Sequence, residues 1–107
     1  AAAMLAKVLR ARSRALGPTH ADTLATAEHL AGLRLRAGRV KDATRLATRV
    51  LRARERVLGR LDEDTGRAAE FLAHCLDKAG KGARAAAVRQ RYPVATRAAP
   101  VEEVLDE

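Results

Sequence analysis

Apolar residues recur at intervals of three and four positions along most of this chain, the spacing that places them on one face of an α-helix. One run should begin near Thr19 or His20, with Thr19 as the cap and Asp22 at the positive end of the helix dipole. Gly38 should end it, because glycine adopts the left-handed conformation without steric cost. The apolar residues of this run are Leu24, Ala27, Leu30, Ala31 and Leu35.

A second run predicts a helix over residues 40–58, ended by Gly59. Two more helices are expected over 62–79 and 81–91, the last one stopping before Pro93. The alanine-rich start resembles a signal peptide, but its charges continue into "RARSR", so residues 1–17 are expected to form a helix as well. The residues expected on the inner face of the 40–58 helix are Ala43, Leu46, Val50, Ala53 and Val57.

The sequence of the loops and of the helices around them occurs twice in similar form, 42 positions apart. "LGPTHADT" (16–23) aligns with "LGRLDEDT" (58–65), and "VLRARSRAL" (8–16) aligns with "VLRARERVL" (50–58). Because loop and apolar positions stay in register, the repetition indicates a helical solenoid. The expected organisation is the second helix of a partial repeat (1–17), a full repeat (18–59), a degenerate terminal repeat (60–92) and an acidic tail (93–107), loose or with one short helix begun by Pro100.

Composition supports an all-α fold. Aromatic residues make up 2% of the chain, essentially Phe71 and Tyr92, so alanine and leucine must fill the core through close helix packing. Almost no stretch shows the β-branched alternation of a strand. At 107 residues the chain is expected to form one small domain.

The order "LGxxHxDTLxxxxxLAxxxxxxGRxxxAxxLxxRVLxxRERVLG", from Leu16 to Gly59, resembles a tetratricopeptide repeat of the kinesin light chain type, and the resemblance extends over about residues 1–92. It implies antiparallel helix pairs stacked into a right-handed α-solenoid, with the first helix of each pair lining a concave groove that binds peptides. The asparagine pair of that groove is replaced here by Glu28-His29 and Glu70-Phe71. The groove positions implied by the resemblance include Glu28, Arg36, Arg67, Glu70, His74 and Lys78.

Charge changes this picture. The net charge is +8, and because the last seven residues, "VEEVLDE", hold four acidic groups, the rest carries 21 basic against 9 acidic residues. On the 40–58 helix four arginines are spaced four, three and four apart, which places them on one stripe, and three basic residues occupy the equivalent stripe one repeat earlier. The stripe residues are Arg45, Arg49, Arg52 and Arg56, with Lys7, Arg10 and Arg14.

Two explanations of the stripe remain open at this level. Like charges on one stripe repel each other and invite an anionic partner. Alternatively, a GC-rich genome favours arginine and alanine codons, and Glu55 with neighbouring acids screens the charge.

No constellation for catalysis, a cofactor or a metal is found. His74 and Cys75 are adjacent and point about 100° apart on a helix, and Cys75 aligns with the apolar Leu33, which predicts a buried, inert thiol. His20 and His29 have no third ligand. A single cysteine and the lack of a long apolar run favour an intracellular location, the cytoplasm or an organelle matrix, away from membranes.

The leading interpretation is therefore a non-enzymatic protein-interaction module or scaffold, expected to be a piece of a longer repeat array, that binds an acidic protein or peptide. Its first helix lacks a hairpin partner, so upstream repeats, another subunit or a second copy of the chain are expected to cover it. The alternative is a small basic subunit of a large assembly that contacts RNA phosphates through the arginine stripes.

Overall fold

The computed structural model describes residues 1–93, and these residues form helices joined by short turns, with no strand among them. The predicted all-α class is thus confirmed for the described part of the chain, and the expected acidic tail lies outside it apart from Pro93. The helices are α1 (Ala2–Leu16), α2 (Ala21–Arg36), α3 (Val40–Leu58), α4 (Glu63–Lys78) and α5 (Gly82–Arg91).

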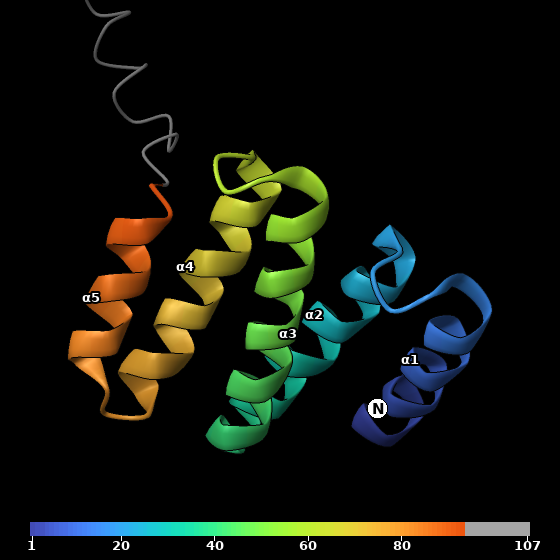
Figure 1. Ribbon diagram of the computed structural model, residues 1–107. Coiled ribbons are helices and arrows are strands. Elements are labelled where there is room, and N and C mark those ends of the chain that lie inside the picture. Colours follow the sequence, from blue (N-terminus) through green and yellow to red (C-terminus); the bar gives the residue numbers. More distant parts are fainter. Residues whose placement is uncertain (94–107) are drawn as a thin grey trace, which may run out of the picture.

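Each helix packs on the next along the chain, and successive helices alternate in direction (Figure 1). We call α2 and α4 the inner helices and α1, α3 and α5 the outer helices, because clefts between neighbouring outer helices have side chains of α2 or α4 on their floor. The core joins alanines that allow close approach of the helices to a few large leucines.

The 42-residue repeat is reproduced in the backbone geometry. Gly38 and Gly80 have φ angles of 84° and 79°, the left-handed region that glycine occupies most readily. After these two inner helices the chain closes with the same hydrogen bond, Arg39 N–H to Arg34 O and Lys81 N–H to Leu76 O, each 2.8 Å. Both hairpins therefore use one turn, as the sequence register predicts.

The helix starts correct one expectation. Thr19 does not cap α2; instead Nδ1 of His20 accepts a hydrogen bond from the Asp22 N–H at 3.0 Å. The equivalent residue of α4, Asp62, accepts from the Asp64 N–H at 2.8 Å. An imidazole and a carboxylate, 42 positions apart, thus accept from equivalent unpaired backbone N–H groups at the helix start.

Burial follows the predicted pattern with one exception. Leu24, Leu30 and Val50 are buried, but Val57, expected on the inner face of α3, is 57% exposed. Val57 lies in the last turn of α3, where the chain turns away toward α4. The end of α3 therefore extends beyond the surface against which the rest of the helix packs. The periodicity of a helix does not reveal where its neighbour ends.

Candidate protein-binding face

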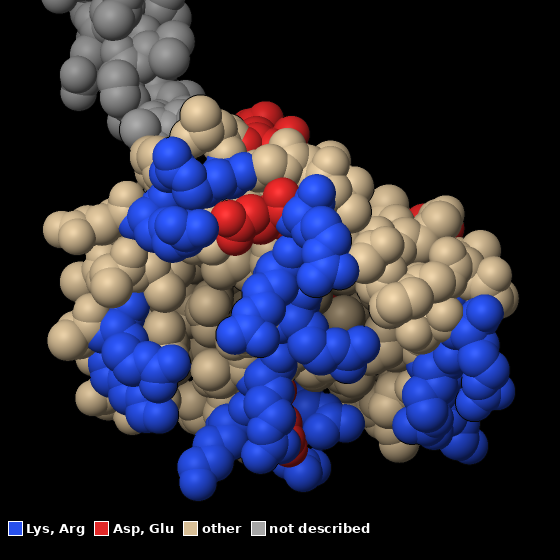
Figure 2. Space-filling view, in the orientation of Figure 1, with Lys and Arg blue, Asp and Glu red and all other residues tan. Residues whose placement is uncertain are grey.

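Charge is divided between the outer and inner helices. The outer helices carry 13 basic and 2 acidic residues, whereas the inner helices carry 4 basic and 6 acidic ones. Figure 2 shows the result on the side that α1, α3 and α5 share: a band of basic side chains along α3, with separate basic groups over α1 and α5. We call this side the basic face. Codon bias alone would scatter arginine over every exposed position, so it does not explain this division.

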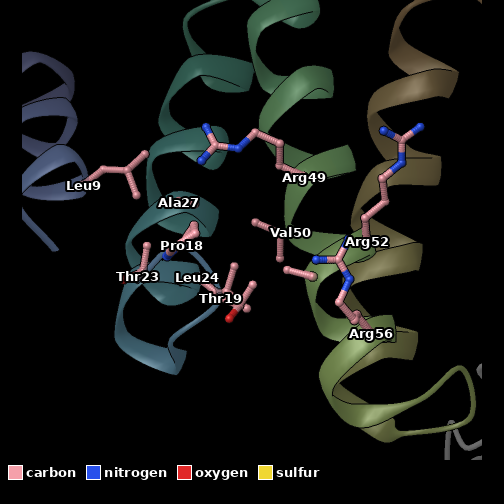
Figure 3. Close-up of a pocket in the computed structure, with 11 residues that line it drawn as sticks. Leu9, Pro18, Thr19, Thr23, Leu24, Ala27, Arg49, Val50, Arg52 and Arg56 are labelled. Carbon is pink, nitrogen blue, oxygen red and sulfur yellow. The ribbon is translucent and has the colours of Figure 1, made fainter. Parts of the chain in front are cut away.

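The first trough of the basic face runs between α1 and α3. Its two parts, of about 220 and 350 Å³, meet at Leu9 and Arg49. The floor is apolar, with Leu24 and Leu30 of α2 contributing to it. Figure 3 shows Arg49 extending from α3 toward the side where Leu9 lies, whereas the guanidinium of Arg52 points the opposite way. The two predicted stripes therefore flank an apolar trough and do not form one continuous stripe.

The stripe residues differ in how their charge is used. Arg45 contacts Asp42 at 3.3 Å, and Asp42 also contacts Arg34 and Arg39. Glu55, the acid expected to screen the stripe, contacts Arg91 at 3.0 Å instead. The stripe residues that are exposed and make no ion pair within residues 1–93 are Lys7, Arg10, Arg14, Arg49, Arg52 and Arg56.

The second trough lies between α3 and α5, above α4, and measures about 350 Å³. Leu51, Leu72 and Val88 supply apolar surface, and no carboxylate from residues 1–93 lines the trough. Its basic residues are Arg52, Arg84 and Arg91.

Three of the six predicted groove residues are neutralised within the protein. Glu28 accepts from Arg54, whose side chain is only 12% exposed, at 3.0 Å. Glu70 accepts from Arg89 at 3.2 Å. The third predicted groove charge, Arg67, contacts Asp64 of its own helix. Most charged side chains of the inner helices are therefore already paired within the protein.

Three other groove residues, Arg36, His74 and Lys78, are exposed and make no ion pair within the described residues. All three lie on the inner helices, His74 one turn before Lys78 on α4. They are isolated charges, and none of them lines either trough.

Arg54, Arg89 and Tyr92 carry structural roles that sequence reasoning missed. Arg89 forms the ion pair with Glu70, and Tyr92 is 7% exposed. The Tyr92 hydroxyl donates to Glu55 of α3, and Arg91 joins the same carboxylate, which fastens the end of α5. The repeat gives no signal for these pairs: Glu28 and Glu70 are 42 positions apart, but Arg54 and Arg89 are 35 apart and so hold different repeat positions.

The surroundings of Glu55 and Glu28 shift the pKa values of these two carboxylates in opposite directions. The hydrogen bond from Tyr92, helped by the charge of Arg91, lowers the pKa of Glu55. Burial raises the pKa of Glu28, although the Arg54 charge opposes the change. The surroundings of Glu55 therefore stabilise its ionised form, whereas the burial of Glu28 partly disfavours its ionised form.

Cys75 is buried, as predicted, and burial raises the pKa of its thiol to about 11. Such a thiol holds almost no thiolate near neutral pH, and the thiolate is the nucleophilic form. Among the described residues no group of three or more His, Cys, Asp or Glu side chains is placed to hold a metal ion.

No protein-family model matches this chain, and no curated protein is significantly similar to it. Within the described residues, no helix is both long and apolar enough to cross a membrane.

Proposed function

We propose that the protein is a non-enzymatic interaction module built from tetratricopeptide-like repeats of the kinesin light chain type, and that its basic face binds an acidic protein segment. The repeated helix hairpins and the turn they share support the repeat assignment. A right-handed solenoid is part of this proposal.

The observation that carries the proposal is the first trough. Arg49 and Arg56 border an apolar floor and have no acidic partner within residues 1–93. An arginine on an apolar rim pairs well with a carboxylate, because charge-assisted hydrogen bonds strengthen as water is excluded. A segment with acidic and apolar side chains on neighbouring positions satisfies both surfaces.

A protein partner fits this face better than RNA does. Single-stranded RNA is held largely by bases stacking on aromatic side chains. The described residues contain two aromatic residues; Tyr92 is buried and Phe71 packs against the core from α4. The floor of the first trough offers Leu9, Leu24 and Val50, which suit apolar side chains.

The test uses fluorescence anisotropy with a labelled synthetic peptide that carries Glu and Leu at helical spacing. Reversing Arg49→Glu and Arg56→Glu should weaken binding at least about tenfold, because each lost charged contact costs about 1–3 kcal/mol. Raising the salt concentration should weaken wild-type binding in the same direction. The matched control is Arg36→Glu with Lys78→Glu, which changes the net charge equally on the inner helices and should leave affinity almost unchanged.

Two outcomes contradict the proposal. If the inner-helix variant loses the peptide and the outer one retains it, binding belongs to the groove. If a single-stranded RNA of similar length binds more tightly than the peptide and depends on Arg49 and Arg56, the protein is the phosphate-binding subunit of an RNA-containing assembly.

A further inference from the structure

The second trough opens beside the point where the described chain stops. Arg91 and Tyr92 at the end of α5 line it, and Pro93 follows directly. Of its three arginines, Arg91 already contacts Glu55, whereas Arg52 and Arg84 make no ion pair within residues 1–93. The trough therefore combines an apolar floor with two arginines that no described carboxylate engages.

The chain itself contains a segment of matching chemistry. Residues 101–107, "VEEVLDE", hold four acidic residues and no basic one. Val101, Val104 and Leu105 are spaced three and one apart, the i, i+3, i+4 pattern of one helical face. The segment thus combines three apolar residues with four acidic ones, the two kinds of side chain that a trough with an apolar floor and a basic rim accepts.

The connection is long enough. Seven residues, 94–100, separate Pro93 from Val101, and an extended chain spans up to about 3.3–3.6 Å per residue, or roughly 23–25 Å in all. The ten residues of α5 rise only about 15 Å. The acidic segment can therefore return along the whole length of the second trough.

We propose that residues 101–107 bind in the second trough of the same molecule, with their carboxylates on Arg52 and Arg84 and their apolar side chains against Leu51, Leu72 and Val88. Attachment through a short connection gives a local concentration on the order of millimolar, so even weak contacts are populated. The first trough is the poorer site, because it contains Asp42 and lies on the far side of α3.

Such a segment competes with other acidic ligands for the basic face. Arg52 borders both troughs, so a segment bound in the second trough lies against the wall that the two troughs share. This competition rests on the function proposed above, whereas the binding of the segment within the molecule does not. The two can therefore fail separately.

Paramagnetic relaxation enhancement on the full chain tests the contact. A nitroxide attached at Asp106→Cys should react selectively, because the only native cysteine, Cys75, is buried and has a raised pKa. Signals of the backbone amides of Thr44, Thr48 and Ala87, which line the second trough, should be broadened. Amides of the inner-helix positions Gly32 and Arg36 should retain their intensity.

Charge-reversal variants then identify which arginines hold the segment in the trough. Arg52→Glu with Arg84→Glu should abolish the broadening, while Arg10→Glu with Arg14→Glu, an equal charge change on α1, should preserve it. Neutralising Glu102, Glu103, Asp106 and Glu107 to amides should tighten binding of the acidic peptide several-fold, since the competent fraction of the basic face rises.

Three results overturn the proposal. The first is an absence of broadening in the second trough, and the second is broadening that survives reversal of Arg52 and Arg84. The third is equal broadening when spin-labelled and isotope-labelled molecules are mixed, which would assign the contact to a second copy. A protein that shows the broadening but binds no acidic peptide contradicts the proposed function and leaves the intramolecular contact established.

Discussion

The arginines of the outer helices are used in two opposite ways. Arg54 and Arg89 leave the outer helices and reach back to Glu28 and Glu70, so each of them ties two helices together. Arg49, by contrast, points over an apolar trough and contacts no acidic side chain in the described chain. The number of arginines therefore does not decide their role. An arginine stabilises the fold where a carboxylate of a neighbouring helix lies within its reach, as for Arg54 and Arg89, and is available to a partner where none does, as for Arg49.

The largest effect is expected where the two layers share their core. Leu30 and Leu72 are nearly fully buried and also reach the floors of the troughs. Changing either to alanine should lower the free energy of unfolding by about 2–5 kcal/mol, because it deletes buried methyl groups and leaves a cavity. Urea denaturation measures the loss. Val57→Ala is the control at an exposed site and should stay within about 0.5 kcal/mol; equal losses would mean that the two layers are not packed as described.

The sequence predicted the helices of the described chain to within a residue or two, because glycine turns and apolar spacing are local properties. It did not predict that Arg54 and Arg89 form ion pairs with the groove residues Glu28 and Glu70, because pairing depends on which side chain of the next helix reaches back to the glutamate. The stripe was recognisable, since four arginines at helical spacing share a side wherever the helix lies. The apolar trough between the stripes was not, because its floor belongs to α2 and its walls to two other helices.

A second prediction compares one arginine from each class. Arg54→Ala should cost about 1–3 kcal/mol, because it leaves the half-buried Glu28 carboxylate without its charged hydrogen bond. Arg49→Ala removes a charge with no partner in the described chain and should change stability by less than about 0.5 kcal/mol. Thermal and urea unfolding of the two variants provide the comparison. Equal effects would show that Arg49 is as structural as Arg54, and the basic face would lose its main support.

The third prediction uses pH, and the two carboxylates should respond with opposite signs. The pKa of Glu55 is lowered on folding, so its stabilisation is present above about pH 4.5 and is lost as the pH falls through the folded pKa. The pKa of Glu28 is raised, so its ionisation in the folded state opposes folding, and acidification toward pH 4.5 relieves that penalty.

Urea unfolding of the wild type and of single glutamine variants isolates each contribution. As the pH falls, the free energy of unfolding of the wild type should decrease relative to that of Glu55→Gln. Over the same range it should increase relative to that of Glu28→Gln. Parallel pH profiles for the two variants would contradict either the hydrogen bond from Tyr92 to Glu55 or the burial that raises the pKa of Glu28.

The smallest expected effect on stability comes from comparing buried threonine hydroxyls. One of them is hydrogen-bonded to an arginine of an outer helix, and the others are not. Thr26 on α2 accepts a hydrogen bond from Arg12 of α1 and donates to the Asp22 carbonyl, each at 2.9 Å. Thr23 and Thr65, 42 positions apart, are buried, and their Oγ1 atoms have no hydrogen-bond partner among the described residues. An unpaired buried hydroxyl loses water without compensation.

Replacing Thr65 with valine keeps the β-branched shape and removes this unpaired group. Thr65→Val, and Thr23→Val likewise, should therefore be neutral or raise the free energy of unfolding by up to about 1 kcal/mol. Thr26→Val should lower it by about 1 kcal/mol, because it deprives Arg12 of its acceptor. Urea titrations of the three variants give the ranking. A clear loss of stability in Thr65→Val would mean that an ordered water satisfies its hydroxyl, since a bound water restores the hydrogen bond that burial removes.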